Sequence, residues 1–551
     1  MFVLLAVLLA VGEPPAADLL LEGGTVYAAP TAAPRKQSIV IGEGKIVFIG
    51  DPAKARKLAP AARAIDLTGR FVFPGWADSH LHLAGLGKSL EVASLRGAAS
   101  AEEAAARMAK AAAALPPGVW VEGRGWDQNL WPGKQFPDAR ALERVGDRPA
   151  LARRVDGHAV WVNQAALKAA GIDAATRDPD GGRILRRADG SPSGVLVDNA
   201  MRLVEKGMPP QGAADLERRL LAGAASCAAL GLTEIQDASG YDADAIGVLE
   251  RLASRGALPI RVYATVSPEP EQLRGFLARG TRVSSGPDFL SVRALKAYAD
   301  GALGSRGAAL LDDYSDEPGK RGLLVTAPER LAEIAREARR AGWQVWIHAI
   351  GDRGNRMALD AFEAAAESLP EAPEGSSRPR IEHAQVVAPE DFPRFARYGV
   401  IASIQPTHAT SDMPWAEDRL GPSRIAGAYA WRRLKTAGAR LAGGSDAPVE
   451  SENPLLGFYA AVTRRDATGQ PPGGWRPAER LSRQEALALF TSDAAYAAFE
   501  EEWRGRIAPG YAADLTVFAR DPMAVPEDEI PTIPVSMTLV GGRIAHGPSN
   551  P

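Results

Sequence analysis

Two histidines lie close together near the start of the chain, in the segment FVFPGWADSHLHL. His80 and His82 end an apolar run with the pattern of a strand, in which residues two apart point to the same face. Two imidazoles on one face can converge on a single cation, and imidazole is a common zinc ligand. Such a pair alone occurs often by chance, as two histidines on the surface or in a loop.

Three further residues stand in the same context, each at the end of an apolar stretch. They are His348 in VWIHAIGD, His383 in PRIEHAQ and Asp446 in RLAGGSDAP. In α/β barrels the functional residues occupy the carboxyl ends of the strands. Each residue alone could be an ordinary core or loop residue, but the shared context of all five favours one metal centre.

Lys296 ends the apolar run FLSVRALKAYADG. Burial of an unpaired ammonium is costly and lowers its pKa. A neutral lysine amine can react with CO₂ to give an anionic carbamate, whose two oxygens can bridge two cations. Alternatively, Lys296 pairs with Asp300, which has the same strand parity. The spacing alone does not decide between these interpretations.

The elements that must position these residues alternate between short apolar strands and Ala-, Arg- and Glu-rich helices, which favours a parallel α/β sheet. One helix is predicted in TAPERLAEIAREARRAG, with a capping box of Thr326 and Glu329 and a C′ glycine at Gly342; Ser482 and Glu485 form a second capping box. The candidate strands are 76–82, 151–156, 231–237, 259–266, 291–300, 343–349, 379–384, 399–404 and 439–445, with 119–124 as a tenth.

An eight-stranded barrel needs fewer strands than these, so we expect at least one of them in an insertion. The stretch from about 95 to 215 is too long and too rich in turns for one loop. Both ends of the chain carry Val- and Ile-rich runs broken by glycines. The predicted organisation is a composite β-sandwich from 13–70 and 505–551, and a barrel over 71–504 with the insertion.

The composition excludes several classes of protein. The 551 residues carry a net charge of −3, which offers no bulk charge for nucleic acid or an anionic membrane. The lone cysteine, Cys227, excludes a disulfide framework and lies in an Ala-rich helix, where we expect it in the core. The apolar run within residues 1–12 fits a signal peptide without a basic start, which predicts export; otherwise the chain would be cytoplasmic.

Several segments together resemble the amidohydrolase superfamily, and within it the YtcJ-like (amidohydrolase 3) branch, which includes N-substituted formamide deformylases. They are FPGWADSHLHL, GRGWDQNLWP, RRVDGHAVWVN, DPDGGRI, GVLVDNAM, LKAYADGALGSRGAALLDDY, WIHAIGDRG, RIEHAQ, GGSDAPV and GRIAPGYAADLTVF. The resemblance spans about residues 18–547. It implies a distorted (β/α)₈ TIM barrel with an inserted subdomain and a composite sandwich, in agreement with the pattern of elements.

The resemblance also implies roles for the chemical residues. His80 and His82 would bind one metal ion, His348 and His383 a second, and a carboxylated Lys296 would bridge them. Asp446 would be both a ligand and the proton carrier. The expected cofactor is one or two Zn²⁺ ions, with Mn²⁺ or Fe²⁺ as alternatives.

Four further residues are candidates for catalysis or substrate binding. His158 in VDGHAVWVN could hydrogen-bond the substrate, or orient a loop. Trp126 and Asp127, near Trp131, could line a substrate wall or pack within a loop. Arg306 could bind a carboxylate or hold its own loop. Glu382 and Asp352 could orient the ligands beside them, and His408 could face the mouth of the site.

The expected activity is hydrolysis of a C–N bond in a linear, non-peptide amide, such as an N-substituted formamide or an N-acyl amine. A cyclic amide or imide hydrolase is the alternative among enzymes. A catalytically inactive exported binding protein on the same scaffold is the alternative from another class. The expected partner is a small-molecule substrate, with no nucleic acid, no stable membrane insertion and a homodimer as one assembly state.

Overall fold

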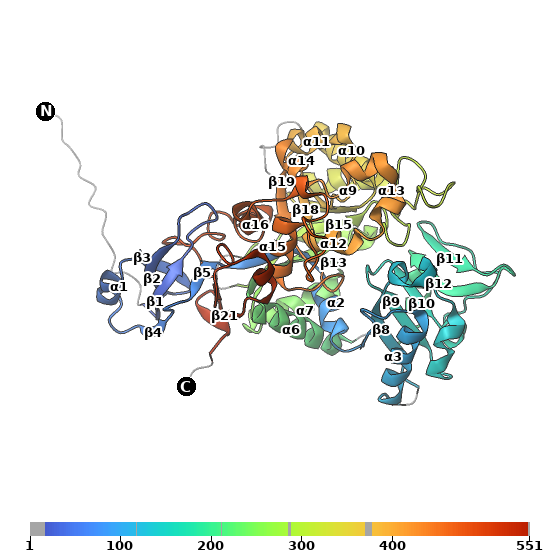
Figure 1. Ribbon diagram of the computed structural model, residues 1–551, viewed down its shortest axis with the longest axis horizontal. Helices are drawn as coiled ribbons and strands as arrows, with labels where there is room; N and C mark the ends of the chain where they lie inside the picture. Colours follow the sequence, from blue (N-terminus) through green and yellow to red (C-terminus); the bar gives the residue numbers. More distant parts are fainter. Residues whose placement is uncertain (1–16, 117, 211, 285–287, 370–376, 549–551) are drawn as a thin grey trace.

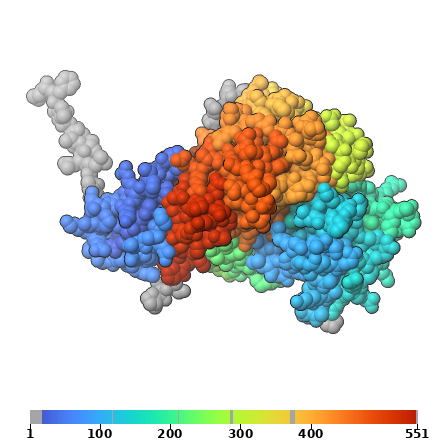
Figure 2. Space-filling model, in the orientation of Figure 1, coloured from blue at the N-terminus to red at the C-terminus, as the bar shows by residue number. Residues whose placement is uncertain are grey.

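A computed structural model describes residues 17–548, except 117, 211, 285–287 and 370–376. The predicted signal segment, 1–12, lies outside the described residues. Within these ranges, none of the helices combines the length and the apolar character that a bilayer crossing requires. Three bodies stand side by side in Figure 1: a sheet built from both chain ends, a central barrel and an inserted lobe. Figure 2 shows the inserted lobe on the side of the barrel away from the terminal sheet.

The barrel is a sheet of eight strands in which every recorded pair is parallel, as the sequence pattern predicts. In sheet order its strands are β19 (Arg440–Gly443), β18 (Ile401–Ile404), β17 (Arg380–His383), β16 (Gln344–Ala349), β15 (Leu290–Tyr298), β14 (Arg261–Val266), β13 (Leu232–Tyr241) and β6 (Trp76–Leu81). The predicted α/β barrel is therefore confirmed. The extra candidate strands 119–124 and 151–156 correspond to β8 and β9, which lie in the insertion.

The first and last strands of the barrel, β6 and β19, are joined by the residues that follow β19 and not by a regular ladder. The backbone N–H of Asp446 donates to the carbonyl of His80 at 2.6 Å. The N–H of Ser445 donates to the Asp78 carboxylate at 3.0 Å. Gly444 lies so close to β6 that a Cβ there would stand 2.5 Å from the His80 nitrogen. We call this contact between β6 and residues 444–446 the closing seam.

Helices cover the outside of the barrel with the apolar face that the sequence pattern predicts. In α9 the buried residues Leu331, Ile334, Ala335 and Ala338 form one stripe against the sheet. The barrel-side helices are α2 (Leu83–Ser89), α6 (Ala213–Ala229), α7 (Ala243–Ser254), α8 (Pro270–Arg279), α9 (Pro328–Arg340), α10 (Asp352–Ser368), α11 (Phe392–Arg397), α12 (Pro406–Asp412), α13 (Ala416–Arg424), α14 (Trp431–Thr436), α15 (Pro454–Thr463), α16 (Arg483–Leu489) and α17 (Ser492–Ala497). Cys227 is buried in α6, as predicted.

The two predicted capping boxes have different outcomes. The box of Ser482 and Glu485 is present at the start of α16. The box of Thr326 and Glu329 is wrong, because α9 begins one residue later, with Ala327 as N-cap and no side-chain cap. Pro328 favours this start, since its fixed φ and missing N–H suit the first helical position. Gly342 follows the C-cap with a φ of 72°, as a C′ glycine does.

The inserted lobe contains a six-stranded sheet with apolar clusters around it. Its strands, in sheet order, are β11 (Gly182–Arg186), β12 (Pro192–Asp198), β10 (Ala159–Val162), β9 (Ala150–Arg154), β8 (Val121–Trp126) and β7 (Ala93–Ser94). Its helices are α3 (Ala101–Ala113), α4 (Gln164–Ala169) and α5 (Met201–Glu205). The sheet and its own cores make the lobe a rigid wall beside the mouth of the barrel.

Strands from both chain ends are hydrogen-bonded into one continuous sheet. They are β1 (Leu19–Val26), β2 (Arg35–Gly42), β3 (Lys45–Gly50), β4 (Arg63–Asp66), β5 (Phe71–Pro74), β20 (Leu515–Phe518), β21 (Val535–Val540) and β22 (Arg543–His546), with helix α1 (Pro52–Leu58) packed on them. N-terminal β5 pairs with C-terminal β20, so neither end completes the sheet alone. The two ends therefore share one sheet, while the predicted β-sandwich with bounds 13–70 and 505–551 stays a prediction.

Candidate functional site

The residues predicted to hold a metal meet at the carboxyl ends of the barrel strands. His80 lies in β6 and His82 follows it, while Lys296, His348 and His383 lie in β15, β16 and β17. Asp446 follows β19 at the closing seam. The parallel strands bring their carboxyl ends to one rim, so residues far apart in the sequence become neighbours.

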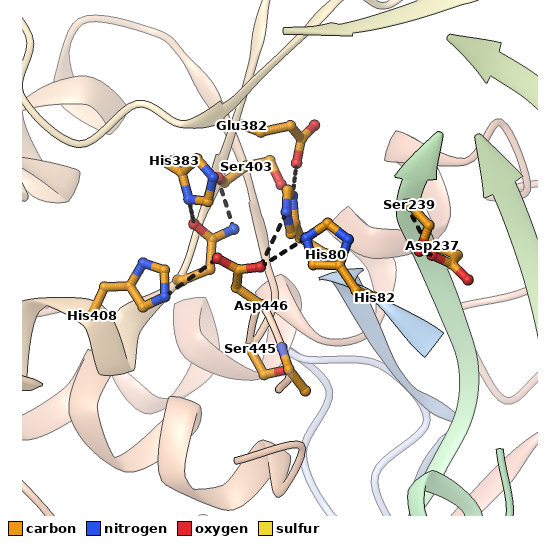
Figure 3. A network of polar contacts seen from close by, with 12 residues as sticks. His80, His82, Asp237, Ser239, Glu382, His383, Ser403, His408, Ser445 and Asp446 are labelled. Atoms are coloured by element: carbon orange, nitrogen blue, oxygen red, sulfur yellow. Dashed lines mark hydrogen bonds and ion pairs between the residues drawn. The ribbon is translucent and has the colours of Figure 1, made fainter. Parts of the chain in front are cut away.

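Three of these residues can share one cation. Ligand atoms of His80, His383 and Asp446 all lie within 4.8 Å of one another, and all three side chains are buried. His82 stands beside them, with its Nε2 3.2 Å from Asp446 Oδ1. Figure 3 shows the Asp446 carboxylate between His80 and His82 on one side and His408 on the other. The centre of the site is therefore a carboxylate surrounded by imidazoles.

The donor atoms at this centre fit a divalent cation. Within the part of the chain that the structure describes, the buried atoms His80 Nε2 and Lys296 Nζ have no hydrogen-bond partner, and Asp446 Oδ1 lies against the imidazoles of His82 and His80, at 3.2 and 3.6 Å. Buried polar atoms are normally paired, so the two unpaired nitrogens indicate a missing partner. Imidazole nitrogen and carboxylate oxygen are typical ligands of zinc. The cluster can therefore hold a metal ion.

Two of the clustered residues have a backbone conformation that side chains other than glycine rarely adopt. The φ angle is 77° at His383 and 59° at Asp446. Such conformations cost about 1–3 kcal/mol each and persist where the surroundings enforce them, often at functional sites. In a regular strand His383 would point to the opposite face from Glu382. The left-handed conformation at the strand end accompanies its turn toward the site.

Polar residues inside the barrel fix the orientation of two imidazoles. The Nδ1 atom of His80 contacts the Glu382 carboxylate, which is fully buried. Arg380 donates to both oxygens of Glu382, at 2.8 and 3.1 Å. Although burial favours the neutral acid, Arg380 and His80 lower the pKa of Glu382 to about 2. His383 Nδ1 lies 2.7 Å from Gln405 Oε1, so both rings turn their Nε2 atoms toward the centre.

Lys296 is buried and does not pair with Asp300. Burial lowers the pKa of Lys296 to about 8. Asp300 instead accepts hydrogen bonds from the backbone N–H groups of Ala309, Ile350 and Gly351. Of the two interpretations left open by the spacing, the pairing with Asp300 is therefore wrong.

His158 reaches the site from the inserted lobe. Its ring centre lies 5.0 Å from that of His348, and its Nδ1 lies 2.7 Å from Asp198 Oδ1. Burial alone would lower the pKa of His158, but the hydrogen bond and charge of Asp198 outweigh burial and raise it. This partner directs the other ring nitrogen, Nε2, away from Asp198, so one edge of the ring is available to a substrate.

Two cavities meet at this cluster. The smaller has a volume of about 210 Å³ and the larger about 830 Å³. Both are lined by residues of the barrel rim and of the inserted lobe. The lining residues that they share are Asp156, His158, His348, His383, Asp446 and Val449. The cleft therefore has two arms, with the possible metal ligands where the arms join.

Two of the predicted substrate-binding residues lie away from the cleft. Trp126 is fully buried, donates to the Ala152 carbonyl and packs against Trp131 inside the lobe. Arg306 pairs with Asp316 at 2.9 Å and with Glu317 at 3.1 Å, which holds its own loop. For both residues the structure agrees with the packing role that the sequence left as the alternative, and not with the substrate-binding role.

Asp127 does line the smaller cavity, where it forms an ion pair with Arg154. Asp352 accepts backbone hydrogen bonds from Leu311 and Arg353, so it does not orient a ligand. His408 faces the site, with Nε2 3.6 Å from Asp446 Oδ2 and its ring stacked on that of His383. Arg380 and Gln405 were not predicted from the sequence. The i, i+2 spacing of Arg380 and Glu382 in PRIEH was the available signal, because it places both on one face of β17.

Comparison with known proteins agrees with this geometry. The sequence profile of the amidohydrolase family matches residues 63–546. The chain belongs to the amidohydrolase family. It is 35% identical over 539 residues to a protein named amidohydrolase YtcJ from Bacillus subtilis (strain 168), covering 95% of this chain and 98% of the relative. It is 26% identical to the N-substituted formamide deformylase of Arthrobacter pascens, covering 96% and 98%.

A solved structure extends the similarity to three dimensions. An uncharacterized metal-dependent hydrolase from Pyrococcus horikoshii OT3 superposes with a TM-score of 0.75 at 29% identity, covering 92% of this amidohydrolase and 99% of that chain. Family and fold together make this protein a hydrolase, and the rim of its barrel has the cluster that can hold a metal ion.

Proposed function

We propose that this amidohydrolase cleaves the C–N bond of a linear, non-peptide amide, such as an N-substituted formamide or an N-acyl amine, with water as the nucleophile. The observation that carries the proposal is the set of His80, His383 and Asp446 ligand atoms that can share one cation, in a cleft whose two cavities both reach His383 and Asp446. A relative along nearly the full length acts on N-substituted formamides by its name.

The proposed cofactor is one or two Zn²⁺ ions, with Mn²⁺ or Fe²⁺ as alternatives. His80, His82 and Asp446 would hold one ion, and His348, His383 and a carboxylated Lys296 would complete a second site. A bound divalent cation would supply Lewis acidity, which activates water near neutral pH and polarises a carbonyl. The lowered pKa of Lys296 supports carboxylation, since only the neutral amine attacks CO₂.

The chain's own residues would divide the remaining work. The Asp446 carboxylate is the one acid at the centre of the cluster, and the surrounding histidines hold its pKa well below the usual range, against the effect of burial. It is therefore ionised and can accept a proton from water and deliver it to the leaving nitrogen. His158, held by Asp198, would donate to the substrate oxygen through Nε2.

The shape of the cleft favours a linear substrate over a cyclic one. Ligands of the cluster lie where two arms join, so the acyl and amine parts of an N-acyl amine can extend into separate arms, whereas a formamide would place only its amine substituent in one of them. A cyclic amide or imide presents one compact ring at the scissile bond and would leave one arm without a substrate group.

The test is a substrate panel assayed with added Zn²⁺ or Mn²⁺: formamides, N-acyl amines, hydantoins and carbamates. We expect hydrolysis of a linear amide, loss of activity on chelation and return of activity on adding metal. Asp446→Asn should lower kcat by about 10²–10⁴-fold, as removal of an acid–base group does. Protein without zinc, manganese or iron, or an Asp446→Asn variant with full activity, would contradict the proposal.

Carboxylation of Lys296 has its own measurement. Native mass spectrometry of metal-loaded protein should show the added mass of one CO₂, and Lys296→Met should lack it. An unmodified amine in active, metal-loaded protein would remove the bridging role of Lys296.

A further inference from the structure

One arginine in the larger arm of the cleft has no acidic partner in the described part of the chain. Arg124 lies in β8 of the inserted lobe and lines the larger cavity. Among the residues that the structure describes, its one hydrogen bond runs from Nη2 to the Val155 carbonyl at 3.2 Å, and its Nε atom is buried without a partner. No Asp or Glu lies within ion-pair distance of its guanidinium among the described residues.

A second positive charge, on the neighbouring strand β9, makes the lack of an acidic partner for Arg124 more destabilising. Arg124 stands directly opposite Arg153 of β9 in the sheet, and like charges in such pairs destabilise it. Arg153 is compensated by Glu205 at 2.5 Å, but Arg124 is not. Burial, with the charges of Arg153 and Arg96, lowers the pKa of Arg124 to about 9. An uncompensated cation kept at this position indicates an anion that is supplied from outside the chain.

The surroundings leave space for that anion. Gly157, which also lines the larger cavity, faces the guanidinium, and a Cβ there would stand 3.6 Å from Nη2. The same cavity continues to Lys296, His348 and Asp446. A ligand bound at Arg124 therefore shares one continuous space with the reaction centre.

We propose that Arg124 binds a carboxylate carried by the substrate, so that the preferred substrate is an amide with an anionic group on the part lying in the larger arm. A guanidinium binds a carboxylate through parallel N–H···O bonds, which suits its planar shape. This inference rests on the proposed amide hydrolysis and adds the charge of the substrate. It makes Arg124 a determinant of specificity and leaves the bond-breaking step to the residues at the rim.

A matched pair of substrates tests the inference. N-formyl-γ-aminobutyrate has the carboxylate, and N-butylformamide is its neutral counterpart. We expect the metal-loaded enzyme to have a higher kcat/KM for the charged substrate. Arg124→Gln should lower kcat/KM for the charged substrate by about 10–100-fold, the range for a lost charged hydrogen bond, and change the neutral one less than threefold. Arg124→Lys should retain part of the preference.

The control is Arg140→Gln, which alters an arginine of the same lobe that is 79% exposed and lines neither cavity. It should leave the preference unchanged. Measurable and equal rates of the wild-type enzyme on the two substrates, or an equal loss on both in Arg124→Gln, would overturn the inference.

A binding measurement separates this inference from the proposed reaction. Calorimetry follows N-formyl-γ-aminobutyrate binding to metal-loaded Asp446→Asn, with and without Arg124→Gln. Weaker binding in the double variant supports the role of Arg124 even if the wild-type enzyme hydrolyses neither formamide, an outcome that would contradict the reaction alone. Equal binding in the two proteins would refute the role of Arg124.

Discussion

Arg380 holds the carboxylate that orients His80. Its side chain is fully buried and donates to Glu382, to Ser403 Oγ, to the Ser79 carbonyl and to Gln236. It also lies over the Trp346 ring, 3.6 Å from its centre. Glu382 contacts His80 Nδ1, on the side of the ring opposite Nε2, and Arg380 contacts Glu382. Arg380 therefore acts on the possible metal ligand His80 through Glu382. It is a positioning residue and not a catalytic one.

Arg380→Met should weaken metal binding by about 10–100-fold, the usual effect of removing a group that orients a ligand. The buried Glu382 would lose its counter-charge, and leaving one charge of a buried pair alone costs about 3–5 kcal/mol of stability. Arg380→Lys should recover part of the metal affinity. The measurement is metal affinity by chelator competition, with stability followed separately. Unchanged affinity in a folded Arg380→Met protein would exclude the positioning role.

The sequence could predict that the rim residues lie together, because each is a possible metal ligand at the end of an apolar run. His80, His348 and Asp446 each end an apolar run, and parallel strands bring such ends to one rim. Trp126 could not be placed in the same way, because the side chain of a residue at the end of β8 points into or out of the lobe according to packing that only the folded sheet defines.

The sequence pattern also could not predict which charged residues within the strands have partners. Arg124 and Arg153 lie in strands of the lobe, where a charged residue usually marks a face turned to water. The parallel register that places them opposite each other is a tertiary property of two strands separated by 23 residues, from Trp126 to Ala150. Only that register shows that one of the two lacks a partner.

At the scale of elements, the closing seam depends on a close approach that only glycine permits. A Cβ at position 444 would lie 2.5 Å from the His80 nitrogen and 2.7 Å from Asp78 Oδ1. Neither atom can give way easily, because the first is backbone and the second accepts hydrogen bonds from His80 and Ser445. The loop after β19 can therefore approach β6 this closely only because Gly444 has no Cβ.

Gly444→Ala should destabilise the protein by about 1–3 kcal/mol, as overpacking does, and lower both metal affinity and activity, because His80 and Asp446 flank the seam. The matched control is Gly275→Ala in α8, where no atom lies within 4 Å of the added Cβ. That change should be neutral or stabilise by about 0.5–1 kcal/mol, since alanine favours a helix. Thermal unfolding and metal titration measure both. Equal behaviour of the two variants would contradict the account of the seam.

The start of α16 gives stability that depends on pH. Glu485 accepts from the Ser482 N–H and pairs with Arg432 at 2.6 Å, and Arg432 is the largest cause that lowers the pKa of Glu485 to about 2. A carboxyl whose pKa falls on folding stabilises the protein above its unfolded value, and that contribution is lost as pH falls toward the folded value.

Glu485→Gln should therefore cost about 1–2 kcal/mol at neutral pH and progressively less as pH falls from about 4.5 to about 2. Glutamine keeps an oxygen for the Ser482 N–H but lacks the charge facing Arg432. Denaturant unfolding of both proteins across this range measures the difference. A difference that grows as the solution becomes more acidic would contradict the assigned sign.

At the scale of the whole molecule, the terminal sheet and the base of the barrel are joined through a buried ion pair. Arg261, the first residue of β14, donates to Asp514, just before β20, at 2.7 and 3.0 Å. Asp514 also accepts from the Gly541 N–H at 2.8 Å. Because both side chains are almost fully buried, the pair is protected from screening by salt.

Asp514→Asn should lower the free energy of unfolding by about 3 kcal/mol, because it removes one charge from a buried pair. The control is Asp418→Asn, which breaks the exposed pair with Lys134 and should cost at most about 1 kcal/mol. Denaturant titration followed by tryptophan fluorescence compares the two. A larger loss in Asp418→Asn than in Asp514→Asn would show that the terminal sheet is not held to the barrel in this way.

The closing seam has a consequence for how the protein folds. His80 and Asp446 are separated by 366 positions in the sequence, and their contact forms only when the first and last strands of the barrel meet. Contacts of such long range form late and slowly in folding. A metal ion bound by both residues would connect the two sides of the closing seam and slow its opening. Loss of a bound metal would then lower the stability of the closed barrel as well as the activity.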